Sequence, residues 1–147
     1  TIMNAGWVDT LGKDFSLNAF GHTLSISRGI KAVFEEVSKV ADAVGITMLE
    51  YPEEDFWRRG SIMPTYSRAV FDKEGTVAKI YGPTSVKSRY ITEDVPLGLV
   101  PISKLGRRFH IATPVIDAVI QLASVINQTN YMKEGLSLEE LGRWSAS

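Results

Sequence analysis

Apolar residues recur at steps of three and four positions between Ser25 and Val44, which is the pattern of one face of an α-helix. The hydroxyl of Ser25 is placed to cap the start of this helix, and Gly45 is placed to end it. The pattern indicates a helix buried on one side. The apolar positions are Ile26, Ile30, Val33, Phe34, Val37, Val40, Ala41 and Val44.

A second helix is predicted from Pro114 to Gln128, because Ile116, Val119, Ile120, Ala123 and Ile126 again share one face. Thr113 is placed to cap this helix. Pro114 suits the first helical position, where its missing N–H has no partner to lose. A short helix is predicted to begin at Ser137, since Ser137 and Glu140 have the spacing of a capping box.

The segments between these helices carry weaker patterns. Short helices are predicted over 52–59 and 65–71. Residues 92–108 look helical but contain Pro96 and Pro101, which predicts two short helices or one bent helix.

The remaining segments show little regular structure. Asn4 to Asp9 is interpreted as a turn or loop, and Lys79 to Tyr81 is too short to found a sheet. We therefore predict a single all-α domain over residues 1–147. Its core is predicted to include Val33, Phe34, Val37, Val119, Ile120 and Ala123.

Composition narrows the classes of function. The chain has 16 Lys+Arg and 17 Asp+Glu, a formal charge of -1, so we expect no nucleic-acid partner. No apolar run approaches the roughly 20 residues of a membrane span. The chain has no cysteine, which excludes disulfides and cysteine-ligated zinc. We expect a cytoplasmic protein, although a cysteine-free chain suits the exterior equally.

Cofactor and metal motifs are missing from the 147 residues. The sequence contains neither Gly-x-Gly-x-x-Gly nor Gly-x-x-x-x-Gly-Lys-Ser/Thr, so it has no recognisable phosphate cradle. Its two histidines, His22 and His110, have no carboxylate at close ligand spacing, and we expect no metal site. His22 is interpreted as a loop residue, and His110 as a residue at a helix C-terminus.

The densest polar cluster runs from Lys87 to Pro96. One interpretation is structural, because acidic residues such as Glu93 and Asp94 belong in the first turn of a helix. The other is functional: Arg89 offers a planar fork for a carboxylate, and Asp94 could orient a histidine or accept from an ammonium group. Residues five positions apart share no helix face, so Arg89 and Asp94 converge only if the chain turns between them.

Two longer motifs carry a resemblance. Residues 89–106 read R-Y-I-T-E-D-V-P-L-G-L-V-P-I-S-K-L-G, and residues 112–123 read A-T-P-V-I-D-A-V-I-Q-L-A. They resemble the C-terminal helical domain of the octopine/nopaline (opine) dehydrogenases. The opening I-M-N-A-G and the closing E-G-L-S-L-E-E-L-G are similar to segments of the same domain.

The resemblance implies an NAD- or NADP-dependent oxidoreductase that condenses an amino acid with an α-keto acid and reduces the resulting imine. It implies an N-terminal Rossmann domain, outside these residues, that binds most of the cofactor. The helical domain would be similar to the C-terminal domain of 6-phosphogluconate dehydrogenase. Arg89 and Glu93 would bind substrate, and Asp94 would be catalytic, orienting the catalytic histidine or holding the amino group.

The chain departs from the family pattern at two places. The family's catalytic histidine precedes the segment matching Ile2 to Gly6, so it lies before Thr1. Leu97 stands where the family often has an aromatic residue.

Alternatives remain open. The domain could belong to a dehydrogenase of another small keto or hydroxy acid, or it could be a non-catalytic dimerisation module. A homodimer is compatible with each of these.

Overall fold

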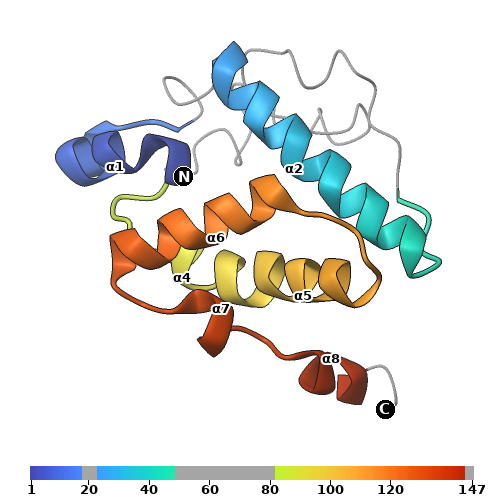
Figure 1. Cartoon of the computed structure of the whole chain (residues 1–147). Helices are drawn as coiled ribbons and strands as arrows, with labels where there is room; N and C mark the ends of the chain where they lie inside the picture. Colours follow the sequence, from blue (N-terminus) through green and yellow to red (C-terminus); the bar gives the residue numbers. More distant parts are fainter. Residues whose placement is uncertain (18–22, 49–81, 145–147) are drawn as a thin grey trace.

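A computed structural model describes residues 1–17, 23–48 and 82–144, and their regular structure is entirely helical (Figure 1). The predicted helices over 52–59 and 65–71, the segment 79–81 and His22 lie outside the described residues. The short helices η1, α1 and η2 come first, and the long helix α2 lies across one end of α6. The helices are η1 (Ile2–Asn4), α1 (Ala5–Leu11), η2 (Gly12–Asp14), α2 (Leu24–Ala43), α4 (Arg89–Thr92), the π-helix η5 (Asp94–Leu99), α5 (Val100–Arg108), α6 (Pro114–Asn127), α7 (Tyr131–Glu134) and α8 (Leu138–Trp144).

Helix α2 confirms the predicted stripe but begins slightly earlier than predicted. Its cap is Thr23, whose hydroxyl oxygen accepts the N–H of Ile26 at 3.4 Å, whereas Ser25 already lies inside the first turn. Thr23 has the extended backbone that a cap requires. At the other end Gly45 adopts a φ of 80°, as a C-terminal glycine does.

Helix α6 confirms the second predicted helix, but its cap differs from the prediction. Thr113 precedes the helix and makes no side-chain hydrogen bond to it. The carboxylate of Glu36, in the middle of α2, accepts the N–H groups of Val115 and Ile116 at 2.9 Å each. Glu36 is buried, so its charge is matched by two backbone donors and the positive end of the helix dipole.

Pro96 and Pro101 act as predicted, since this segment forms two helices, η5 and α5, that are joined without a gap. Pro96 lies in η5, where the N–H of Val100 reaches back to the carbonyl of Val95. Pro101 occupies the first turn of α5, the part of a helix that tolerates proline best. The capping box at the start of α8 is also confirmed, because Glu140 accepts from the Ser137 amide at 2.8 Å and the Ser137 hydroxyl accepts from Glu140 N–H at 3.2 Å.

The core lies mainly between residues 86 and 131, with α2 packed against its side. Of the predicted core residues, Ile120 and Ala123 are buried, Val33 and Val37 pack against the core, and Phe34 and Val119 are partly buried. The buried cluster consists of Val86, Ile91, Val95, Val100, Ile116, Ile120, Ala123 and Tyr131.

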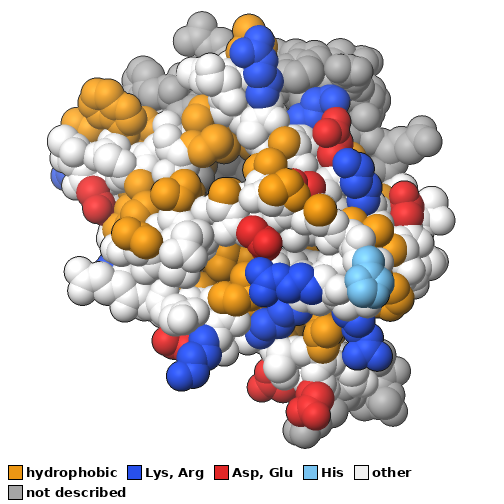
Figure 2. Space-filling model, in the orientation of Figure 1, with side chains coloured by type: hydrophobic (Ala, Val, Ile, Leu, Met, Phe, Trp, Pro, Cys, Tyr) orange, Lys and Arg blue, Asp and Glu red, His pale blue; other side chains and the backbone are white. Residues whose placement is uncertain are grey.

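The interpretation of residues 4–9 as a loop is wrong, because Ala5–Leu11 forms α1. This segment is poor in helix formers, so tertiary packing decides its structure. Val8 is fully buried and Ala5 packs against the core. On the opposite side, Met3 of η1 and Trp7 and Leu11 of α1 are exposed, with Trp7 at 61%, and Figure 2 shows apolar surface over α1.

Candidate functional site

The three residues predicted to form the site lie at the junction of α4 and η5. Arg89 is the first residue of α4 and Asp94 is the first of η5, while Glu93 joins the two helices with φ -112° and ψ -53°. Glu93 keeps a right-handed helical backbone and its carbonyl accepts the N–H of Leu97 at 2.9 Å. The chain therefore stays helical from Arg89 into η5 and does not form the turn that the convergence of Arg89 and Asp94 was predicted to require. All three side chains are exposed, and within the described part of the chain no hydrogen bond or ion pair joins one of these side chains to another.

Asp94 lies close to the first residue of the chain. The Asp94 carboxylate is near enough to the backbone nitrogen of Thr1 to act on it electrostatically. The structure thus brings Asp94 next to the segment Thr1–Asn4, which is remote from it in sequence.

The turn before α4 is held by residues from both ends of the domain. The N–H of Val86 donates to Asp9 Oδ1 of α1 at 3.1 Å, and the carbonyl of Val86 accepts from Asn127 Nδ2 of α6 at 3.0 Å. Lys87 Nζ also donates to the carbonyl of Asn127 at 3.0 Å. Arg89 follows this turn directly, so its backbone position depends on α1 and α6.

Sequence reasoning missed Asp9, Asn127 and Glu36. Each is a single polar residue whose partner is a backbone group at least 41 positions away. A helical pattern places such a residue on a face but does not indicate its distant partner. The Asp117 of the second motif likewise acts between helices, because it accepts from the Ser103 hydroxyl at 2.5 Å and lies 3.4 Å from Arg107.

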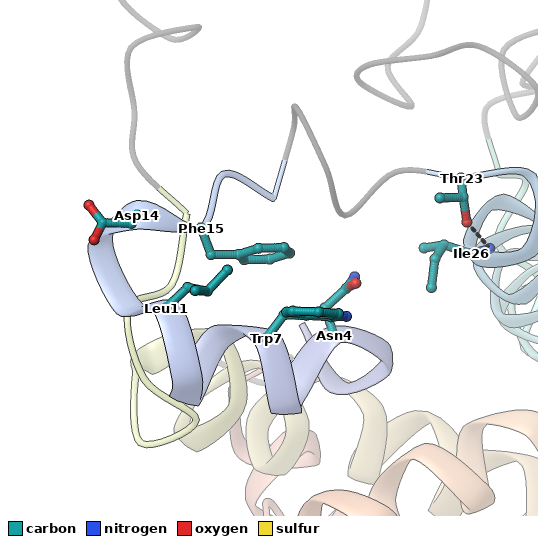
Figure 3. Close-up of a pocket in the computed structure, with 7 residues that line it drawn as sticks. All are labelled: Asn4, Trp7, Leu11, Asp14, Phe15, Thr23 and Ile26. Atoms are coloured by element: carbon teal, nitrogen blue, oxygen red, sulfur yellow. Dashed lines mark hydrogen bonds between the residues drawn. The ribbon is translucent and has the colours of Figure 1, made fainter.

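A hollow of about 610 Å³ opens beside α1 (Figure 3). Trp7 and Leu11 project from α1 below the ring of Phe15, and Thr23 and Ile26 face them from the start of α2. The lining is mostly apolar. Asn4 also lines it and donates its backbone N–H to the Thr1 carbonyl at 2.9 Å, so the hollow adjoins the segment beside Asp94.

The remaining site predictions concern metals and histidines. His110 lies just past Phe109, the C-cap residue of α5, and has a φ of 58°, which agrees with its predicted place at a helix C-terminus. In the described residues, no group of three or more carboxylates and histidines could hold a metal ion. None of the described helices combines the length and hydropathy of a membrane span.

Comparisons with known proteins agree on one family. A family model described as NAD/NADP octopine/nopaline dehydrogenase, alpha-helical domain, matches residues 1–127. An opine dehydrogenase of Arthrobacter sp. (strain 1C) is 35% identical, in an alignment that covers 97% of this chain and 39% of that relative. The chain thus spans well under half the length of the relative, which is long enough to contain a further domain. The chain belongs to the octopine/nopaline dehydrogenase family, of which it carries the alpha-helical domain.

Proposed function

We propose that this domain binds the substrates of an NAD- or NADP-dependent enzyme of the cytoplasm, which condenses an amino acid with an α-keto acid and reduces the product. Arg89 binds a substrate carboxylate through its planar pair of donors, and Glu93 contacts the substrate beside it. Asp94 orients the catalytic histidine. The observation that carries this proposal is the proximity of the Asp94 carboxylate to Thr1. By resemblance, the family's histidine precedes this same segment.

The described residues offer no recognisable phosphate cradle for a dinucleotide. The sequence has no glycine-rich phosphate motif, and the N-terminus of α6 is already occupied by the Glu36 carboxylate. We therefore assign the cofactor to a Rossmann domain elsewhere in the whole protein, and no step of the chemistry is assigned to a cofactor held by this chain. The similarity to the C-terminal domain of 6-phosphogluconate dehydrogenase stays a prediction.

The exposed side of α1 is proposed to face that cofactor domain. Met3, Trp7 and Leu11 form an apolar stripe there, and large apolar patches on soluble proteins commonly mark interfaces. The adjoining hollow reaches Asn4, one helical turn from Thr1. A domain resting on α1 would therefore lie beside Asp94, where the nicotinamide must meet the substrate.

Steady-state kinetics of the whole protein test the assignment of Asp94. The variant Asp94→Asn keeps a residue that can begin a helix but removes the negative charge. We expect kcat to fall by about 10²–10⁴-fold, the effect of an acid–base group, while the melting temperature is unchanged. Turnover at the wild-type rate would rule out the catalytic role.

A second variant tests Arg89. The variant Arg89→Lys keeps the charge but cannot form the planar pair of hydrogen bonds, so we expect a higher KM for a substrate carboxylate.

The wild-type protein also tests the alternative functions. If it reduces the keto acid at the same rate with and without the amino acid, it is a dehydrogenase of another keto acid. Absence of any turnover in the whole protein would favour a dimerisation module.

A further inference from the structure

We propose that Asp9 and Asn127 are positioning residues that hold Val86 from both sides and so fix the place of Arg89. This inference rests on the proposed function of Arg89 in binding a substrate carboxylate. The hydrogen bonds of the Asp9 and Asn127 side chains go to Val86, and that of Asn127 also to Tyr131, rather than to Arg89. They act on the backbone of the turn that leads into α4.

The two hydrogen bonds fix both peptide groups of Val86. Its N–H is bonded to Asp9 Oδ1 at 3.1 Å, and its carbonyl is bonded to Asn127 Nδ2 at 3.0 Å. The side chain of Val86 is buried in the core at 5% exposure. Apolar burial has no preferred direction, so it alone would let the turn slide or tilt. Hydrogen bonds at both peptide groups fix the orientation of the turn as well as its position.

The fixed backbone continues directly into α4. The Ser88 amide donates to the carbonyl of Ser85 at 3.1 Å, and the Ser88 carbonyl accepts from the amides of Ile91 and Thr92 at 3.0 and 3.1 Å. Ile91 is fully buried. The backbone at Arg89 is therefore held between Val86 on one side and Ile91 on the other.

Arg89 itself depends on this backbone. Its side chain is exposed, and no side chain among the described residues pairs with it. Two planar hydrogen bonds to a carboxylate tolerate an error of about 0.5 Å in the position of the donors. Loss of the hydrogen bond at Val86 is therefore expected to displace Arg89 through the backbone. It should raise the KM for the substrate more than it lowers kcat.

Asp9 offers the cleaner test because it is exposed, whereas Asn127 is buried and also donates to the Tyr131 hydroxyl at 2.9 Å. In the whole protein, Asp9→Ala removes the acceptor for the Val86 amide. Asp9→Asn removes the charge but keeps an oxygen in the same place. We expect Asp9→Ala to raise the KM for the carboxylate substrate about 10-fold with a smaller change in kcat, and Asp9→Asn to restore the wild-type KM.

A double-mutant cycle connects Asp9 to Arg89. If Asp9 acts through Arg89, then Asp9→Ala adds no further rise in KM to the Arg89→Lys variant, because the effects of coupled residues are not additive.

The variant Tyr131→Phe is the control for the bond between Asn127 and Val86. It removes the other hydrogen bond of Asn127 Nδ2 and leaves the bond to Val86, so we expect a wild-type KM.

Amide hydrogen exchange gives a readout independent of activity. We expect Asp9→Ala to speed exchange at Val86, Ile91 and Thr92 and to leave the amides of α8 unchanged. Unchanged exchange at these amides, an unchanged KM in folded Asp9→Ala, or additive effects in the cycle would each overturn the positioning role. Faster exchange together with a wild-type KM in Arg89→Lys would instead overturn the proposed function of Arg89.

Discussion

Glu36 in α2 accepts the backbone N–H of Ile116, a residue 80 positions later in the chain, at 2.9 Å. Its second carboxylate oxygen accepts the N–H of Val115 at the same distance. One side chain therefore provides the cap of α6 and attaches α2 to it. The role that a local cap plays in most helices is here played by a tertiary contact.

Replacement of Glu36 should destabilise the domain strongly. Glu36→Ala leaves the buried N–H of Ile116 without an acceptor, and we expect a loss of about 2–4 kcal/mol in the free energy of unfolding, from cap and desolvation together. Urea denaturation measures this loss. Glu35→Ala at the neighbouring exposed position is the control, and it should change the stability far less. Equal effects of the two variants would contradict the assignment of Glu36 as the cap.

Gly135 is predicted to tolerate no side chain. A Cβ atom there would lie 2.7 Å from the Pro96 carbonyl oxygen and 2.8 Å from that of Tyr131. Both neighbours are backbone atoms, so Gly135→Ala should cost about 1–3 kcal/mol in the free energy of unfolding. The variant Gly98→Ala in η5 is the control, because a Cβ atom at Gly98 would meet nothing within 4 Å. Its effect should stay within about 0.5 kcal/mol, as thermal unfolding can show.

The pKa of Glu35 should respond to its neighbour Lys31. A hydrogen bond from Lys31 holds the pKa of Glu35 below its usual value of 4.5. The stabilisation from this pair is therefore present at neutral pH and is lost as the pH falls through the lowered pKa. In Lys31→Met, the pKa of Glu35 should rise towards 4.5, as an NMR titration of its carboxyl carbon can measure. An unchanged pKa would show that the pair does not persist in solution.

The isolated domain, residues 1–147, should bind no NAD(P)H, because the proposed cofactor site lies on another domain. A fluorescence titration of the reduced cofactor tests this, and binding in the micromolar range would contradict the division of roles.

The domain should also associate with itself through the exposed apolar side of α1. Sedimentation of Trp7→Ser should show weaker association than that of Leu122→Ser, which alters the exposed side of α6. The opposite order would place the contact on α6.

The predicted elements differ in how well the sequence specified them, and the difference has a physical cause. Helices α2 and α6 each repeat apolar residues over several turns, so their period and burial were readable from the residues alone. The capping box of Ser137 and Glu140 was equally readable, since both partners lie within one turn.

Features that depend on distant partners were not readable. Helix α1 carries Gly6, Val8 and Thr10, and it is helical because Val8 is buried rather than because its residues favour a helix. For the candidate site, the motif singled out Arg89 and Asp94, but the helical backbone at Glu93 does not provide the turn that was expected between them. The residues that hold the turn before α4 became visible only with the bonds of Val86 to Asp9 and Asn127.

The attachment of Val86 also bears on when the turn can form during protein synthesis. Its amide partner precedes it by 77 residues and its carbonyl partner follows it by 41. Closing loops of this length costs entropy that only the assembled core repays, and contacts of such separation form late. When Asp94 has just been added to the growing chain, every residue of the 89–94 motif has been synthesised, but the turn before the motif has not yet been fixed. The motif takes its shape only after Asn127 has emerged, so a chain cut short before α6 would carry the sequence of the site without its geometry.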